Sequence, residues 1–478
     1  MRRLDEFLAE ESGAALIYVT LLMPVIVGVG VLAVDFSRLS SLSTALQKGA
    51  DSLALAAAAE LDRKPTAIVR ADAAIAGLVA NQHKFSTAGL ANVTVGSKRY
   101  LQSLPGNDAT AIGAGNETTD PLLARYVEVT ATAQTLNTIL PASLLGGTNT
   151  ATATARAVAG FDAAVCQFTP MFICNPYEGG ATSLFDVVKT PAERRKQIKM
   201  QLGPGGESQY FPGNYGWLDS PSFGSGENGA NVLRDALAKV APNACFYQNG
   251  VSQKTGNIEN ADAAINTRFD LWSGPFNNSH DDSNYRPSLN VRKGYKMKAT
   301  GNPSPCNTKD TEDPPIQNTN KLGRDASFPS AGGRLGDGVW PFQQYWDSNF
   351  GGVAPNGWDN SNLPSRFDVY RYEIDNDLTE TAAIGGAAAG EVGTPQCYSG
   401  GGLNDTPDRR IIFAAVINCS GLNVHGNSGG PLPVLAFGKF FLTEPVTADG
   451  TIHAEITGLV EPGSSSDSVA RDIVQLYR

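Results

Sequence analysis

The sequence predicts an α+β protein. We expect an N-terminal transmembrane helix that extends into a small α/β unit, followed by a loop-rich, mostly β outer domain. Three observations predict this order: one long uncharged run, alternating strand patterns between 91 and 160, and a later region that Gly, Asn, Ser and Pro interrupt every few residues. The expected domains are a membrane anchor over 1–35, a helical extension over 36–84, an α/β unit over 85–160 and the outer domain over 161–478.

The uncharged run covers residues 12–34 and reads SGAALIYVTLLMPVIVGVGVLAV. As a helix it is about 35 Å long at about 1.5 Å per residue, enough to cross a hydrocarbon core of roughly 30 Å. A cleaved signal peptide is the alternative, but the run ends in LAVDFSRLS, which lacks a small-residue cleavage site. The sequence therefore favours an uncleaved single-pass anchor, with weak orientation signals from Arg2, Arg3, Arg38 and Lys48 on its two sides.

All six cysteines lie beyond residue 160, and none forms a Cys-x-x-Cys motif. An even number confined to one part of the chain suits disulfides in an oxidising compartment, with six buried free thiols as the alternative. This predicts that the C-terminal part lies outside the cytoplasm and the amino end inside. We predict one disulfide between the first two cysteines, because Pro170 sets a turn between them. The other pairs are assigned only by proximity, 245 with 306 and 397 with 419. The six are Cys166, Cys174, Cys245, Cys306, Cys397 and Cys419.

The helix is predicted to continue beyond the membrane, because leucines recur at a spacing of three and four residues with small residues beside them. Such a stripe allows close approach of another element. It serves either as packing against the protein's own next domain or as a seam for a membrane-anchored partner helix, and the sequence favours neither. The stripe contains Leu39, Leu42, Leu46, Gly49 and Leu53.

In the α/β unit, strands are expected in ANVTVGSKRYL, ARYVEVTATAQTL and TNTATATARAVAG. In the outer domain, helices are expected over 190–202 and 228–242. Strands are expected over 366–374, 410–419, 433–442 and 452–460, and the last three should form a sheet.

Composition and motifs exclude several classes of site. The formal net charge is −10 and no long basic run occurs, so nucleic acid is not an expected partner. The four His, at 83, 280, 425 and 453, form no pair at zinc-ligand spacing. The acidic stretches SHDDSN and EIDND do not fit a calcium loop and are interpreted as solvated turns. We therefore expect no catalytic, metal-binding or cofactor-binding residues.

The stretch HGNSGGPLPV resembles the nucleophile loop of chymotrypsin-like serine proteases, with Ser428 in the nucleophile position. A triad also needs a histidine and a carboxylate, in that chain order. His425 is too close in the chain, His280 lies in a polar loop, and Pro433 interrupts the following strand. A Gly-rich connection between strands is the favoured interpretation. A membrane-tethered ligand-binding or hydrolytic ectodomain remains the alternative function.

The N-terminal 60 residues resemble TadG-type proteins of the bacterial Tad/Flp (tight adherence) pilus assembly system. The resemblance covers ESGAALIYVTLLMPVIVGVGVLAVDFSRL and ALQKGADSLALAAAAEL. More weakly, the order of elements to residue 160 resembles the pilin-like α/β unit of TadE and TadG proteins. The positions that match the family pattern are Gly13, Ala14, Pro24, Val34, Asp35, Leu46, Gln47, Ala50, Asp51 and Leu55 to Ala58.

The resemblance implies a non-enzymatic pilus-assembly component in the bacterial inner membrane, with its C-terminal domain in the periplasm or outside. It implies other assembly components as partners, TadE-like membrane proteins above all, in a homo- or hetero-oligomer. Two departures matter. Tyr18 stands where pilins and TadE relatives carry a Glu, so the first 13 residues should be retained. The metal loop of some TadG proteins, Asp-x-Ser-x-Ser, is not matched by DFSRLS, where Leu39 replaces the second Ser.

Overall fold

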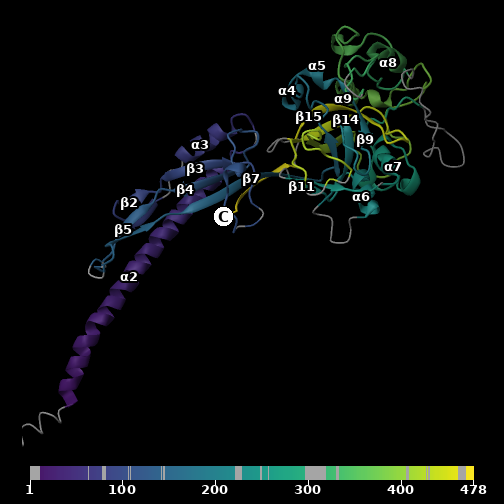
Figure 1. Ribbon diagram of the computed structural model, residues 1–478. Helices are drawn as coiled ribbons and strands as arrows, with labels where there is room; N and C mark the ends of the chain where they lie inside the picture. Colours follow the sequence, from purple (N-terminus) through teal and green to yellow (C-terminus); the bar gives the residue numbers. More distant parts are fainter. Residues whose placement is uncertain are drawn as a thin grey trace, which may run out of the picture. The chain divides into compact units, whose positions relative to one another are not determined.

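The computed structural model describes residues 11–477 except 63, 78–81, 106, 108, 142, 144–145, 221–228, 248–249, 257, 296–318, 330–332, 405–407, 427, 429–430 and 461–469 (Figure 1). The chain forms two compact units. The first contains residues 1–162 and 472–478, and the second contains residues 163–471. The second unit is therefore inserted between the body of the first and its last strand. The outer domain predicted from the sequence, 161–478, includes residues 472–478, which the structure places in the first unit.

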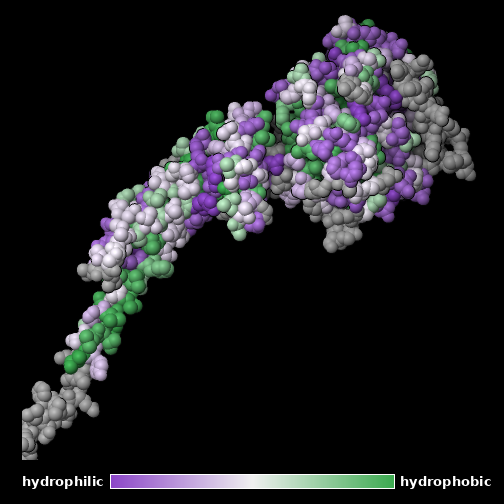
Figure 2. Space-filling view, in the orientation of Figure 1, coloured by the Kyte–Doolittle hydropathy of each residue, from purple (hydrophilic) through white to green (hydrophobic). Residues whose placement is uncertain are grey.

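Helix α2 (Glu11–Ala58) is one continuous helix of 48 residues that includes Pro24. Its first half carries exposed apolar side chains from Ile17 to Phe36, the green stretch of the helix in Figure 2. In the part of the chain that the structure describes, it is the one helix long and apolar enough to cross a membrane. The predicted continuation of the helix beyond the apolar run is confirmed.

The second half of α2 packs on an antiparallel sheet of the first unit, which the resemblance predicted as an α/β unit. Strand β4 (Tyr126–Ala131) pairs with β3 (Val95–Leu101) on one side and with β7 (Arg156–Cys166) on the other. Leucines and alanines of α2 share one core with Val127, Val129 and the alanines of β7. The remaining elements are α3 (Ala67–Gly77) and the hairpins β1–β2 (Gln82–Ser86, Gly89–Asn92) and β5–β6 (Gln134–Asn137, Thr150–Ala153).

The last strand, β16 (Ala470–Leu476), pairs with β7 in the first unit. The backbone N–H of Tyr477 donates to the carbonyl of Val158 at 2.8 Å, and its ring packs edge-on against Tyr126 with centroids 5.1 Å apart. The two ends of the insertion are thus both tied to β7.

The second unit is built on a mixed sheet with the order β12-β10-β8-β13-β14-β15-β9. Strand β9 also pairs with β10 in parallel, so the strands from β10 round to β9 close into a barrel. Both faces of β8, β13 and β14 are largely buried, which explains their nearly continuous apolar sequences. The strands are β8 (Met171–Cys174), β9 (Gln197–Leu202), β10 (Asn214–Asp219), β12 (Ser252–Lys254), β13 (Ile411–Ile417), β14 (Ala436–Leu442) and β15 (Ile452–Leu459).

Short helices cover this barrel. Leucines of α6 and alanines of α7 join the main hydrophobic cluster of the sheet, whereas α8 and α9 form a separate aromatic cluster with Phe441. Strand β11 (Cys245–Tyr247) pairs with the end of β7 that belongs to this unit. The helices are α4 (Leu184–Val187), α5 (Pro191–Arg194), α6 (Ala230–Ala238), α7 (Ala261–Asn266), α8 (Phe342–Asn349) and α9 (Arg366–Asp375).

The predicted strands 410–419, 433–442 and 452–460 are confirmed as the adjacent antiparallel strands β13, β14 and β15. The predicted helix over 228–242 is confirmed as α6. The predicted strand over 366–374 is wrong, because this segment is helix α9, which begins with a capping box between Ser365 and Asp368. The predicted helix over 190–202 holds only for its first turn, since residues from Gln197 onward form β9.

The predicted disulfide between Cys166 and Cys174 is wrong. Cys166 bonds Cys245, which lies directly opposite it in the pairing of β7 with β11. Cys174 bonds Cys419, so the predicted pairs 245–306 and 397–419 are wrong as well. Cys397 is also disulfide-bonded, and Cys306 lies outside the described residues. The nearest cysteines in sequence do not pair because β8 lies beside β13, more than two hundred residues away, rather than folding back on β7.

Candidate functional site

The predicted partner-helix seam lies in the core of the first unit. Leu42 and Leu46 are fully buried, Leu53 is 3% exposed, Gly49 is buried and Leu39 packs against the same cluster. These residues face the sheet of their own unit, so a partner helix has no access to them. Of the two uses that the sequence left open, the structure shows the internal one.

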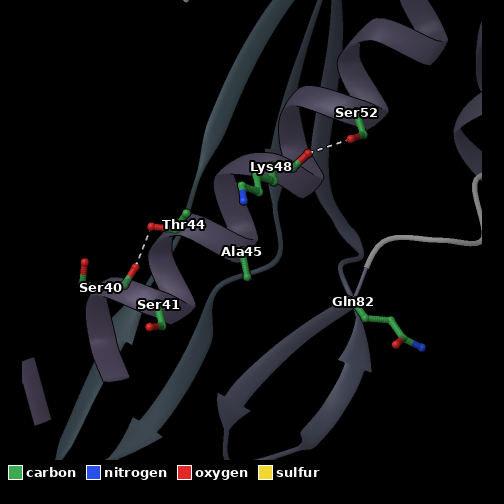
Figure 3. Close-up of a pocket in the computed structure, with 7 residues that line it drawn as sticks. All are labelled: Ser40, Ser41, Thr44, Ala45, Lys48, Ser52 and Gln82. Carbon is green, nitrogen blue, oxygen red and sulfur yellow. Dashed lines mark hydrogen bonds between the residues drawn. The ribbon is translucent and has the colours of Figure 1, made fainter. Parts of the chain in front are cut away.

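A groove runs along the other side of the same helix stretch. Its volume is about 530 Å³. Figure 3 shows the lining side chains of α2 along one side of the helix, with Gln82 at the start of β1 nearby. This site was not predicted from the sequence, although small or polar residues recur along it at intervals of four positions. The lining residues are Ser40, Ser41, Thr44, Ala45, Lys48, Ser52 and Gln82.

Two of the hydroxyl groups that line this groove are bonded to their own helix. Thr44 donates to the carbonyl of Ser40 at 2.9 Å, and Ser52 donates to the carbonyl of Lys48 at 2.8 Å (Figure 3). Because these donors are satisfied within the helix, a second element can cover them without leaving a buried polar group unpaired. Small side chains also let the backbone of a second helix approach closely. The groove is thus suited to helix docking, with Lys48 as its ionisable side chain.

A second cleft, of about 450 Å³, lies in the second unit beside β9, β10 and β12. Six glycines line it, together with Tyr210, Trp217, Gln253 and Lys254 among others. The Tyr210 hydroxyl accepts from the Gln253 amide at 3.2 Å, and burial raises the pKa of Tyr210. This cleft offers aromatic and backbone surface for a ligand rather than a set of acid and base groups.

Ser428 has a local structural contact. Its Oγ accepts a hydrogen bond from the backbone N–H of His425 at 2.8 Å, and its own N–H donates to the His425 carbonyl at 3.1 Å. These two bonds close a turn. Nδ1 of His280 lies 3.4 Å from Oγ of Ser399, so this ring is directed to another serine.

We predict that Ser428→Ala leaves the biological activity of the protein unchanged, because Ser428 closes a turn. A serine-directed phosphonate probe applied to the wild type and the variant checks this. Labelling of the wild type but not of the variant would restore the protease hypothesis.

Acidic side chains from both stretches accept hydrogen bonds within the protein. Asp282 accepts from the backbone N–H of Asn284 at 2.8 Å and caps a short helical turn. Glu373 is fully buried and accepts from the Asn290 amide at 2.6 Å. Among the described residues no group of three His, Cys, Asp or Glu side chains could hold a metal ion.

The second unit buries many charged side chains, which the sequence analysis did not anticipate. One group surrounds Glu444, which lies 2.8 Å from Lys321 and 2.5 Å from Arg324. Nδ1 of His453 lies 2.8 Å from the same carboxylate. Although burial opposes it, the neighbouring His453 and the two cations lower the pKa of Glu444, and burial lowers the pKa of His453. The carboxylate is therefore ionised and the ring neutral at pH 7, which suits a structural ion pair.

Residues 13–60 match the family model described as "Putative Flp pilus-assembly TadE/G-like". Comparisons with curated proteins and with solved structures found no significant match. The match confirms the resemblance predicted from the N-terminal sequence. It covers the exposed apolar part of α2, its extension and the lining residues of the groove from Ser40 to Ser52.

Proposed function

We propose that this protein is a membrane-anchored, non-enzymatic component of Tad/Flp pilus assembly that presents a disulfide-bonded domain outside the cytoplasm. One observation carries the proposal: the segment that matches the pilus-assembly family is a single helix that joins an exposed apolar span to the core of an α/β unit. This arrangement attaches a folded body rigidly to the membrane.

The disulfides support an exported location. Cys166–Cys245 and Cys174–Cys419 both lie in the second unit, and disulfides persist in oxidising compartments. With one span, the amino end then lies in the cytoplasm, and the units lie in the periplasm or beyond. A bacterial inner membrane follows from the family resemblance.

The groove on α2 is the proposed docking site for a TadE-like membrane protein. A partner anchored in the same membrane presents its own helix at the same height, parallel to the lining residues Ser40 to Ser52. The hydroxyls of Thr44 and Ser52 are satisfied within the helix, so a partner can pack closely over these two positions without leaving their donors unpaired. Either a relative or a second copy of this chain fits this chemistry.

We predict that a photoreactive amino acid at Lys48 crosslinks to a membrane-anchored assembly component in cells, because Lys48 is exposed in the groove. The same probe at Val69, 69% exposed on α3 of the same unit, is the matched control. Thr44→Trp should fill the groove and reduce the yield at Lys48 about tenfold, equivalent to about 1.4 kcal/mol of association free energy. Mass spectrometry of the product distinguishes a relative from a second copy.

Equal yields at Lys48 and Val69, or a yield that Thr44→Trp leaves unchanged, would contradict docking in the groove. Normal piliation of cells that lack the whole protein would contradict the assembly role itself.

The cleft beside β9 and β10 favours one alternative, a membrane-tethered ligand-binding ectodomain. A variant of the cleft residue Trp217 distinguishes the two functions. If Trp217→Ala abolished function in a protein that stays folded while Thr44→Trp had no effect, the ligand-binding alternative would replace the docking proposal.

A further inference from the structure

The chain that leaves strand β5 presents apolar side chains at the surface. Ile139 is 56% exposed, Leu140 is half-buried and Pro141 is exposed. The segment is ordered by local hydrogen bonds: the N–H of Thr138 donates to the Asn149 carbonyl, and its hydroxyl donates to the Leu140 carbonyl, both at 3.0 Å. These bonds order the turn while Ile139 and Pro141 remain exposed at its surface.

This turn, which we name the β5 tip (residues 139–141), is held by helix α2. The Asp35 carboxylate, 5% exposed, accepts from the N–H of Ile139 at 2.9 Å and from the N–H of Leu140 at 2.8 Å. Arg38, one turn further along, donates to the Asn137 carbonyl at 3.2 Å and lies 3.3 Å from Asp35. Two side chains of the helix thus fix the backbone of the β5 tip.

Asp35 also marks the height of the membrane boundary. It is the first charged residue after the uncharged run that ends at Val34. The neighbouring side chains Val34 and Phe36 are 49% and 72% exposed, so they face outward from the helix. A span needs about 20 apolar residues, so the run places its C-terminal end where hydrocarbon meets headgroups. The β5 tip is bonded to the helix at this level.

We infer that the β5 tip inserts into the interfacial layer of the membrane that α2 spans. Ile139, Leu140 and Pro141 supply the apolar contact, while Asp35 and Arg38 keep the tip at the depth of the headgroups. Apolar side chains at this depth contact acyl chains, and the backbone donors of the tip are already satisfied by Asp35. We assign a lipid surface, rather than a protein, as the binding partner of the β5 tip, because the tip lies next to the end of the exposed apolar stretch of α2. The function of this contact is to orient the α/β unit at the membrane. The inference rests on the membrane-spanning part of the proposed function.

The test uses the full chain in vesicles of phosphatidylcholine and phosphatidylglycerol, with no other protein present. Three variants, Ile139→Cys, Ile26→Cys in the span and Val69→Cys on α3, are labelled with an environment-sensitive fluorophore. The structure shows no free cysteine among the described residues, and the labelled parent protein gives the background. The label at 139 should be blue-shifted and quenched several-fold by lipids that carry a nitroxide near the headgroup. The label at 69 should remain unquenched.

If the label at 26 is blue-shifted and the label at 139 behaves like the one at 69, the inference fails while membrane anchoring stands. If the label at 26 shows no blue shift either, the anchoring itself fails. Asp35→Ala in the Ile139→Cys background should remove most of the quenching at 139. Full quenching in that double variant would overturn the role of Asp35 as the clamp.

Discussion

Removing the Cys174–Cys419 disulfide with the double variant Cys174→Ala/Cys419→Ala should lower the free energy of unfolding of the second unit by about 4–5 kcal/mol. The bond closes a loop with a sequence separation of 245 residues. In the chain-entropy model the stabilisation grows with the length of the closed loop. The loss is a large fraction of the total for a domain, whose stability is typically about 5–15 kcal/mol.

Tryptophan fluorescence during urea denaturation measures this loss, because all five tryptophans, at 217, 272, 340, 346 and 358, lie in the second unit. Reduced wild-type protein keeps its sulfur atoms but loses the Cys166–Cys245 bond as well. It should therefore show at least the same loss. An unchanged midpoint in the double variant, or a peptide that links Cys166 to Cys174 in non-reducing mapping, would contradict the observed pairing.

Arg366→Met should destabilise the second unit by about 3–5 kcal/mol, because it leaves two buried carboxylates without their cation. Arg366 is fully buried. Its guanidinium donates to Glu455 at 2.6 Å and to Asp325 at 2.6 Å. The carboxylate of Glu455 also accepts from the backbone N–H of Arg366 at 2.9 Å, at the first turn of α9. The ion pairs therefore join α9 to strand β15 and to the segment that contains Asp325.

Arg371→Met on the same helix is the matched control. Arg371 is 30% exposed and pairs with Asp375, 57% exposed, at 2.9 Å. Such a surface pair contributes about 1 kcal/mol or less. Adding Glu455→Gln to Arg366→Met should recover part of the lost stability, because it removes one uncompensated charge. Equal midpoints for the two single variants in urea would show that the buried group contributes no more than a surface pair.

Elements whose signal is local were predictable from the sequence. The apolar part of α2 follows from an uncharged run whose continuous apolar length no other stretch of the chain equals, and its extension follows from leucines at helical spacing. Strands β13, β14 and β15 follow from long apolar runs separated by turn residues. The family match at 13–60 was predictable for the same reason, since it rests on consecutive residues.

Segments with ambiguous periodicity were misassigned. The stretch RFDVYRYEI alternates like a strand, but its buried side chains, Arg366, Val369, Tyr370 and Glu373, have helical spacing. Arg366 and Glu373 are charged, and the oppositely charged partners that they meet in the folded state offset the cost of burying them. Sequence patterns that count charged residues as exposed cannot recover such a helix.

The sequence alone determined the long apolar helix, its extension, the strand-rich outer part and the presence of cysteines suited to disulfides. Tertiary structure decided which cysteines meet, because β8 pairs with β13 rather than with its neighbours in the chain. It also decided which side of α2 is free. The leucine stripe is covered by the unit's own sheet, and the small polar residues opposite it remain open as a groove. The physical reason is the same in both cases: pairing of strands and burial of a helix face depend on residues far apart in sequence, which only the folded chain brings together.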